Sequence, residues 1–412
     1  MPCHGERSAA PRVERPRWEV ADVFHAHGEA YRRSHALSSD PLKVMRAIEA
    51  CRTEVLGGHL DVCPECDFRR PSYNSCRNRH CPKCQSLAQA RWIEQRILRI
   101  LPVHYFHVVF TLPAELRPLA RHNRRRLFDL LFEAASQTLL ELGDDPKRLG
   151  GRLGITSVLH TWTRELLFHP HLHCLVTGGG LAPSGQAWLP LRPRYLFPVK
   201  VLGALFRGKF LAGLRRLHSD GLLQLSGRAA RLSDPEVFAH LLDKLYRTRW
   251  VVYAKRPFAG PEHVFRYLGR YTHRVALSNH RIQLIDEQGV RFATKDGRAI
   301  TLPHQAFIGR FLEHVLPKGF TKIRHFGLHA SGNVATKLAQ ARRLLTPVST
   351  APPPPALAAT EPLPWPELVL KLTGLDPIRC PDCGSPLIRR PLPRALVATS
   401  RPAPAPAPSD TS

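Results

Sequence analysis

Runs of β-branched and aromatic residues predict the strands of this chain. FHVVFTL at residues 106–112 is such a run, and its length is typical of one strand. Residues 155–162 and 172–176 predict two strands that pair as a hairpin, the second of which ends at three consecutive glycines, 178–180. Shorter runs predict extended structure at residues 248–254, 281–286 and 290–294.

Apolar residues at helical spacing predict the helices of the chain. These helices cover residues 41–51, 86–101, 116–142, 199–217, 235–246, 261–277, 303–315 and 334–345. Strands and helices follow one another irregularly rather than in strict alternation. This order favours an α+β fold over a doubly wound parallel sheet.

Composition divides the chain into four regions. Residues 1–17 are polar and rich in proline and arginine, and we expect them to be disordered. Residues 18–101 are rich in cysteine and histidine, residues 102–345 carry most of the predicted strands and helices, and residues 346–412 form a proline-rich linker and tail. The tail contains one isolated Cys-x-x-Cys pair, Cys380 and Cys383, for which the sequence shows no partner pair.

The charge of the chain points to a polyanionic partner. The 412 residues include 60 lysines and arginines against 33 acidic residues, a net charge of +27. A nucleic acid is the natural partner for such an excess. No apolar stretch approaches the roughly 18 residues of a membrane-spanning helix, and the N-terminal sequence lacks the apolar core of a signal peptide. We therefore expect a cytoplasmic protein with no membrane partner.

Two Cys-x-x-Cys pairs predict a structural zinc site. Two thiolates at this spacing can bind one Zn²⁺, and a second pair completes a tetrahedron that leaves no position open for catalysis. The predicted ligands are Cys63, Cys66, Cys81 and Cys84. The alternative is a set of four reduced, buried cysteines without metal. Four neighbouring residues would suit a second zinc ion: Cys51, His59, Cys76 and His80.

Basic residues surround these cysteines. Arg77, Arg79 and Lys83 lie between or beside the paired thiols, and we expect them to contact DNA phosphates. The alternative interpretation is a basic surface that faces only solvent.

A cluster of histidines follows in HTWTRELLFHPHLH, residues 160–173. Residues two apart in a strand share a face, so His171 and His173 point the same way. A hairpin folded about Glu165–Leu166 would bring His160 opposite His173, on the face of His171. Three imidazoles with an open coordination position predict a catalytic divalent metal. Isolated histidines packed in a core, or a histidine-triad nucleotide hydrolase with a histidine nucleophile, are the alternatives.

Two tyrosines stand four residues apart in the helix predicted over residues 261–277. Tyr267 and Tyr271 therefore share one face, and three arginines form an adjacent stripe suited to phosphates: Arg266, Arg270 and Arg274. By themselves two such tyrosines usually form a packed face. Together with the histidines upstream, they predict phenols that attack a phosphate.

Seven strings carry a resemblance to a known family: ACRTEVLGGH, CPECD, YNSCRNRHCPKCQ, YFHVVFTLP, VLHTW, HPHLHCLV and YLGRYTHRVALSN. Over roughly residues 18–345 the chain resembles the two-tyrosine HUH (His-hydrophobic-His) rolling-circle transposases of the insertion-sequence ninety-one family. The resemblance implies an N-terminal zinc module that binds DNA, followed by an HUH endonuclease core in which helices flank a central antiparallel sheet. It also implies that His171 and His173 are the family's histidine pair, Tyr267 and Tyr271 its tyrosine pair, and His160 a third ligand, as in related relaxases.

The implied function is transposition by cleavage and rejoining of single-stranded DNA at element ends. Mg²⁺ or Mn²⁺ would polarise the scissile phosphate while a tyrosine forms a 5′-phosphotyrosine link and releases a 3′-OH. The tyrosyl ester conserves the bond energy, so we expect no nucleotide cofactor, and the chain lacks a GxxxxGK[ST] loop. Two rivals stay open. One is a zinc-dependent DNA-binding protein without catalysis, and the other is the histidine-triad hydrolase.

Overall fold

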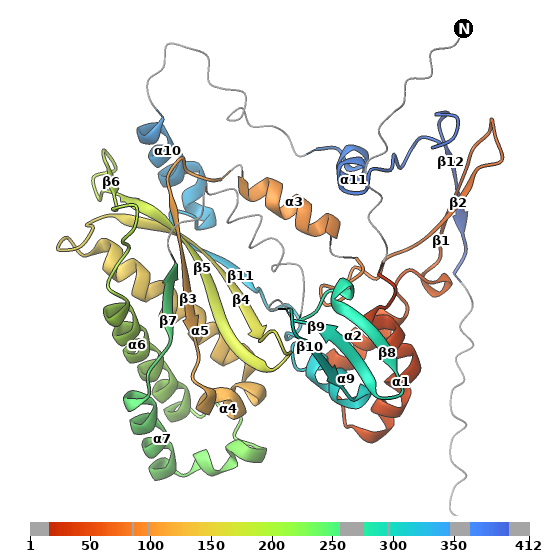
Figure 1. The fold of residues 1–412 in the computed structure, drawn as a ribbon. Helices are drawn as coiled ribbons and strands as arrows, with labels where there is room; N and C mark the ends of the chain where they lie inside the picture. Colours follow the sequence, from red (N-terminus) through yellow and green to blue (C-terminus); the bar gives the residue numbers. More distant parts are fainter. Residues whose placement is uncertain are drawn as a thin grey trace, which may run out of the picture.

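The computed structural model describes residues 16–84, 86–97, 99–255, 276–294, 297–346 and 363–394. Helices and three antiparallel sheets make up this part of the chain (Figure 1). The predicted α+β class is therefore confirmed. No helix among the described residues is long and apolar enough to span a membrane.

The largest sheet has six strands and forms the centre of the molecule (Figure 1). Its strands are β3 (Tyr105–Thr111), β4 (Arg152–Trp162), β5 (Phe168–Leu181), β6 (Trp188–Pro190), β7 (Val252–Lys255) and β11 (Ile323–Gly327). Five of them follow the order β11-β4-β5-β3-β7, while β6 pairs with the end of β5. The edge strand β11 was not predicted from the sequence.

Strand β5 runs through the three glycines at which the sequence placed its end. A Cβ atom at Gly179 would lie 2.6 Å from the Leu189 carbonyl oxygen, and one at Gly180 would lie 2.6 Å from the backbone of Gly151. The glycines therefore let neighbouring backbone approach β5 closely rather than end the strand.

One face of this sheet packs against helices, and the apolar residues between them form the main hydrophobic core. The helices that pack against it are α4 (Arg117–His122), α5 (Arg124–Asp144), α6 (Val199–Ser219) and α7 (Pro235–Arg247). Leu172, Cys174 and Val176 of β5 point into this core, as their alternation with the histidines predicts. The histidines consequently lie on the opposite face of β5.

A second core joins the N-terminal helices to residues 276–315 around a small sheet. Helices α1 (Val20–Ser34) and α2 (Ser39–Glu49) pack against α9 (His304–Leu312) and the sheet of β8 (Ile282–Asp286), β9 (Gly289–Ala293) and β10 (Ala299–Leu302). Phe24 meets Phe311 edge to face, with ring centroids 5.5 Å apart. The N-terminal helices thus share a core with residues 276–315, across the boundary predicted at residue 101.

The third sheet has the order β12-β1-β2. Its strands are β1 (Gly58–Val62), β2 (Arg69–Tyr73) and β12 (Ile388–Leu392). The sequence assigned the C-terminal segment to a separate tail, whereas β12 pairs with β1 in an antiparallel register from Gly58↔Leu392 to Val62↔Ile388. Three further α-helices are α3 (Ser86–Ile97), α10 (Ala339–Leu345) and α11 (Trp365–Thr373), and short 3-10 or π-helical turns connect several of the elements.

Candidate functional site

Three histidines converge on the face of the central sheet that lies away from the main core. One ring nitrogen from each of His160 on β4 and His171 and His173 on β5 lies within 4.8 Å of the other two. His160 is buried, while His171 and His173 are half-buried. The structure thus brings together the three imidazoles that the sequence singled out.

The register of the hairpin differs from the predicted one. His160 pairs with His171, and Val158 rather than His160 stands opposite His173. The turn spans Thr163 to Leu167, and an irregularity between His160 and Trp162 shifts the register. The ring of His160 still approaches that of His173, with a centroid distance of 4.3 Å.

The second core fixes the tip of this hairpin. Leu166 adopts a left-handed backbone conformation with φ 60°, and its side chain is completely buried in the second core. His314 donates from Nε2 to the Leu166 carbonyl at 3.1 Å and accepts at Nδ1 from the Thr161 hydroxyl at 3.2 Å. Arg310 donates to the Glu165 carbonyl. Residues after position 300 therefore hold β4 and β5 in the register that groups the histidines.

Hydrogen bonds set the orientation of two of the three imidazoles. His171 Nδ1 donates to the His169 carbonyl at 2.7 Å, which directs Nε2 toward the cluster. His173 Nδ1 lies 2.8 Å from Nε2 of His107 on β3. A histidine that ligates a metal commonly uses its other ring nitrogen in such a bond.

His107 was missed by the sequence prediction. The sequence does contain a sign of its role, because this histidine interrupts the otherwise apolar strand FHVVFTL. His169 belongs to the same histidine-rich string, but its Nδ1 accepts a hydrogen bond from Arg117 at 3.1 Å, and it lies outside the cluster.

Burial favours the neutral form of two of these imidazoles, His160 and His171. It lowers the pKa of His160 well below the usual value, and the adjacent His173 and His171 lower it further. Burial also lowers the pKa of His171 to about 4. Neutral imidazole is the form that binds metal ions, so His160 and His171 are in their ligating form at neutral pH.

A buried lysine adds positive charge near this cluster. Lys322 precedes β11, is 8 % exposed, and its charge contributes to the lowered pKa of His160. Burial, together with the charge of Arg79, lowers the pKa of Lys322 to about 7. An arriving phosphate would favour its ammonium form.

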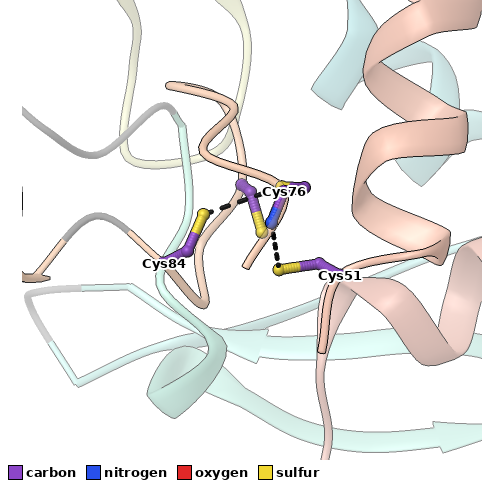
Figure 2. A group of neighbouring side chains, drawn as sticks. Cys51, Cys76 and Cys84 are labelled. Atoms are coloured by element: carbon purple, nitrogen blue, oxygen red, sulfur yellow. Dashed lines mark hydrogen bonds between the residues drawn. The ribbon is translucent and has the colours of Figure 1, made fainter. Parts of the chain in front are cut away.

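The cysteines form two clusters, not the single site that the sequence predicted. Figure 2 shows part of the first, in which Cys51 follows α2 and the other members lie in the loop between β2 and α3. Its members are Cys51, Cys76, Cys81 and Cys84, and those of the second are Cys63, Cys66, Cys380 and Cys383.

The hairpin of β1 and β2 explains why the predicted pairing was wrong. Cys63 and Cys66 lie in its turn, whereas the first cluster lies near its open end, where Gly58 pairs with Tyr73. Five residues of strand separate the two ends, a distance of about 15 Å. One metal ion therefore cannot bind Cys63, Cys66, Cys81 and Cys84 together.

The two histidines proposed as further zinc ligands lie outside both clusters. His80 Nδ1 lies 3.0 Å from the Asn78 side-chain oxygen, and its Nε2 accepts from the Leu316 backbone N–H at 3.1 Å. His59 Nε2 lies 3.7 Å from a carboxylate oxygen of Asp61. Both imidazoles thus serve contacts within the protein.

Comparison with known proteins gives the family. Residues 23–112 match the family described as "Transposase zinc-binding domain", and residues 154–337 match the one described as "Putative transposase". The chain is 46% identical over 372 residues to "Putative transposase y4qJ" of Sinorhizobium fredii, covering 89% of this chain and 92% of that protein. This chain belongs to the insertion-sequence ninety-one family of transposases.

A second relative extends the match. The transposase is 29% identical over 366 residues to "Transposase for insertion sequence element IS801" of Pseudomonas savastanoi pv. phaseolicola, covering 82% of this chain and 80% of that protein. No solved structure matches it. Membership of the family makes the protein a DNA-processing enzyme of transposition with DNA as its partner. The zinc-binding domain, which contains all four cysteines of the first cluster, gives it structural zinc.

The structure describes only some of the residues predicted to bind DNA. Arg77 is exposed, whereas Arg79 donates to the carbonyls of Pro317 and Phe320 and Lys83 forms an ion pair with Glu19. Arg79 and Lys83 thus contribute to packing inside the transposase. The predicted tyrosine helix lies outside the described residues, and with it Tyr267, Tyr271, Arg266, Arg270 and Arg274.

Acid should weaken the anchor of the hairpin. Burial lowers the pKa of His314 to about 3, so the unfolded chain binds a proton below about pH 6.5 that the folded chain does not. The stabilisation that neutral His314 contributes is therefore fully present above pH 6.5 and is lost as the pH falls toward 3. At pH 5 this residue alone should lower the free energy of unfolding by on the order of 2 kcal/mol. We expect the midpoint of thermal unfolding to fall between pH 7 and pH 5.

The His314→Gln variant tests this prediction. Glutamine retains a donor and an acceptor but does not titrate, so the midpoint should depend less on pH than in the unmodified transposase, even if it is lower at pH 7. His122→Gln is the control, because His122 is exposed. If the midpoint of thermal unfolding changed equally with pH in all three proteins, the result would contradict the role given to His314.

Proposed function

We propose that this transposase cleaves and rejoins single-stranded DNA at the ends of its element by the rolling-circle route, through 5′-phosphotyrosine intermediates. The observation that carries the proposal is the convergence of His160, His171 and His173 within 4.8 Å on one face of a sheet whose other face is packed. Three imidazoles leave a bound cation with open positions for phosphate oxygens.

The donor set suits a divalent cation. His171 is fixed through its Nδ1 and His173 contacts His107 through its Nδ1, so each would bind a metal through Nε2. When bound, Mn²⁺ or Mg²⁺ would supply electrophilic stabilisation of the scissile phosphate. Imidazole nitrogen binds Mn²⁺ better than Mg²⁺, so Mn²⁺ should support cleavage at the lower concentration.

The nucleophiles in this proposal are Tyr267 and Tyr271. A phenol oxygen forms a bond to phosphorus while the bond to the 3′ oxygen breaks, and that oxygen leaves as a 3′-OH after taking a proton. Rejoining is the reverse, in which a 3′-OH attacks the phosphotyrosine and the phenol is restored. The reaction needs no nucleotide cofactor, because the tyrosyl ester conserves the energy of the bond.

Positive charge would guide the strand to these groups. Arg266, Arg270 and Arg274 occupy the stripe beside the tyrosines in the sequence, and Lys322 places a buried amine near His160. A hollow of about 540 Å³ is lined by the run Arg121–Arg126 and, among others, by Ser38, Asp40, Pro41, Val315 and Pro317. Arg125 and Arg126 are exposed there, which suits contacts to phosphates.

The proposal predicts the polarity of the products. A 5′-labelled single-stranded oligonucleotide that carries a candidate element end should be shortened in Mn²⁺ or Mg²⁺, and a polymerase should be able to extend the new 3′-OH. A chelator should prevent cleavage. A product that carries a 3′-phosphate, or one that forms equally well without added metal, would refute the proposed chemistry.

The same assay separates the two rivals. A DNA-binding protein without catalysis would retard the oligonucleotide in a native gel and leave its length unchanged. A histidine-triad hydrolase would cleave small nucleotides and become modified on a histidine, with no covalent link between protein and strand. Only strand cleavage that leaves a 3′-OH supports the proposed function.

A further inference from the structure

The second cysteine cluster joins two regions that lie more than 300 residues apart in the sequence. Cys63 and Cys66 occupy the turn between β1 and β2, and Cys380 and Cys383 occupy a turn that precedes β12. The Sγ atoms of Cys63 and Cys383 are 3.4 Å apart, and those of Cys66 and Cys380 are 3.6 Å apart. The zinc-binding domain that matches this chain ends at residue 112 and therefore does not include the later pair.

These distances suit four ligands of one metal ion. Zinc binds thiolate sulfur at about 2.3 Å, so the sulfurs of a tetrahedral site are about 3.8 Å apart. A disulfide would place two sulfurs about 2.05 Å apart. The sulfurs of this cluster therefore stand close to the edges of a zinc tetrahedron and well beyond a covalent bond.

The two turns have matching sequences and hydrogen bonds. The first reads Cys-Pro-Glu-Cys and the second Cys-Pro-Asp-Cys. The backbone N–H of Cys63 donates to the Phe68 carbonyl at 3.0 Å, and that of Cys380 donates to the Ser385 carbonyl at 2.9 Å. Each turn thus closes five residues after its first cysteine. Two zinc knuckles of the same construction face each other.

The sheet that carries this cluster has little apolar core of its own. Asp61 is the one buried residue of β1, and no residue of β2 or β12 is buried. Asp61 accepts hydrogen bonds from Arg70 and Arg389, which bridge the three strands. A sheet that buries a carboxylate rather than a hydrophobic layer needs another source of stability, and a metal ion is the usual one in small modules.

We propose that Cys63, Cys66, Cys380 and Cys383 bind a second structural Zn²⁺, which fastens residues 363–394 to the N-terminal zinc module. The four thiols lose their protons on binding and leave no position for a substrate. The C-terminal segment, including α11, which contacts α3, is then part of the module rather than an appendage. The inference does not depend on the DNA chemistry proposed above.

Metal content gives the first test. The full-length transposase, purified without chelators, should contain two equivalents of zinc, and the Cys380→Ser/Cys383→Ser variant should contain one. Asp382→Asn is the matched control, because Asp382 is exposed between the two cysteines and lies outside the cluster. It should retain both equivalents. A single equivalent in the unmodified protein, with no loss in the double variant, would overturn the proposal.

A cleavable chain gives the second test, which does not depend on counting metal. A protease site inserted between residues 354 and 355 allows the C-terminal segment to be cut from a transposase that is held by an N-terminal tag. We expect the cut segment to stay bound in zinc-containing buffer, and the Cys380→Ser/Cys383→Ser substitution to reduce the retained fraction at least tenfold. Equal retention by both proteins, or oxidised cysteines in the unreduced protein, would show that zinc does not fasten the segment.

Discussion

Replacement of His171 or His173 by alanine is expected to abolish strand cleavage by the transposase while leaving DNA binding within about threefold of its original affinity. Each substitution removes one of three ring nitrogens that converge within 4.8 Å. Stabilisation of a phosphate by a metal contributes several kcal/mol, so the rate should fall on the order of 10³-fold or more. Cleavage of a labelled oligonucleotide measures the rate, and a gel-shift titration measures binding.

His169→Ala is the matched control for this experiment. His169 lies on the same strand, its side chain contacts Arg117, and its carbonyl, which orients His171, is unchanged by the substitution. The cleavage rate of His107→Ala should lie between that of His169→Ala and those of His171→Ala and His173→Ala. We expect the rate to fall about 10- to 100-fold and a higher Mn²⁺ concentration to restore part of it, because His107 positions His173. Full cleavage by His171→Ala or His173→Ala would rule out a metal site at this cluster.

Loss of both tyrosines should have an equally large effect. Tyr267→Phe/Tyr271→Phe removes the two phenol oxygens and leaves the rings, so folding and DNA binding should persist while covalent adducts disappear. Each single substitution should keep some cleavage but block complete transposition. If the residues lie on the predicted helix, an offset of about 6 Å along its axis lets only one phenol reach the phosphate at a time.

The pH dependence follows from the same chemistry. A free phenol has a pKa near 10, so the proposed attack requires loss of its proton. Cleavage should therefore rise with pH as long as the fold is stable. A rate that falls steadily between pH 6.5 and 8.5 would count against a tyrosine nucleophile.

The histidine cluster could be predicted because its pattern is local. The alternation of His171 and His173 with Leu172 and Cys174 fixes which side chains face the core, whatever packs against the strand. The register of His160 could not be predicted in the same way. It depends on the irregularity beside Trp162 and on His314, which lies 148 residues after Leu166.

The cysteine clusters likewise depend on contacts that the local sequence pattern does not reveal. Spacing identifies Cys63 and Cys66 as a pair of zinc ligands, but it does not say which pair completes the site. The nearest pair in the sequence, Cys81 and Cys84, belongs to the other cluster, because the β1–β2 hairpin carries Cys63 and Cys66 away from it. The pair that joins Cys63 and Cys66 is Cys380 and Cys383, which follows a proline-rich segment that the sequence predicts to be a linker.

The packing of α1 against α9 and the pairing of β12 with β1 were missed for the same physical reason. Both depend on contacts between residues more than 250 positions apart in the sequence, and neither changes the local hydrophobic pattern. Strand β12, IRRPL, carries two arginines and a proline, and its side chains are mostly exposed. Its position comes from backbone pairing and from the bond between Arg389 and Asp61.

Covalent capture tests the central claim most directly. A 3′-labelled single-stranded oligonucleotide that carries the element end is incubated with Mn²⁺ and the transposase, and labelled protein is separated on a denaturing gel and mapped by peptide mass. The account predicts a label on the peptide that contains Tyr267 or Tyr271, in the unmodified protein and in each single phenylalanine variant, and none in the double variant. A phosphotyrosine adduct in the double variant, or strand cleavage without any adduct in the unmodified protein, would contradict it.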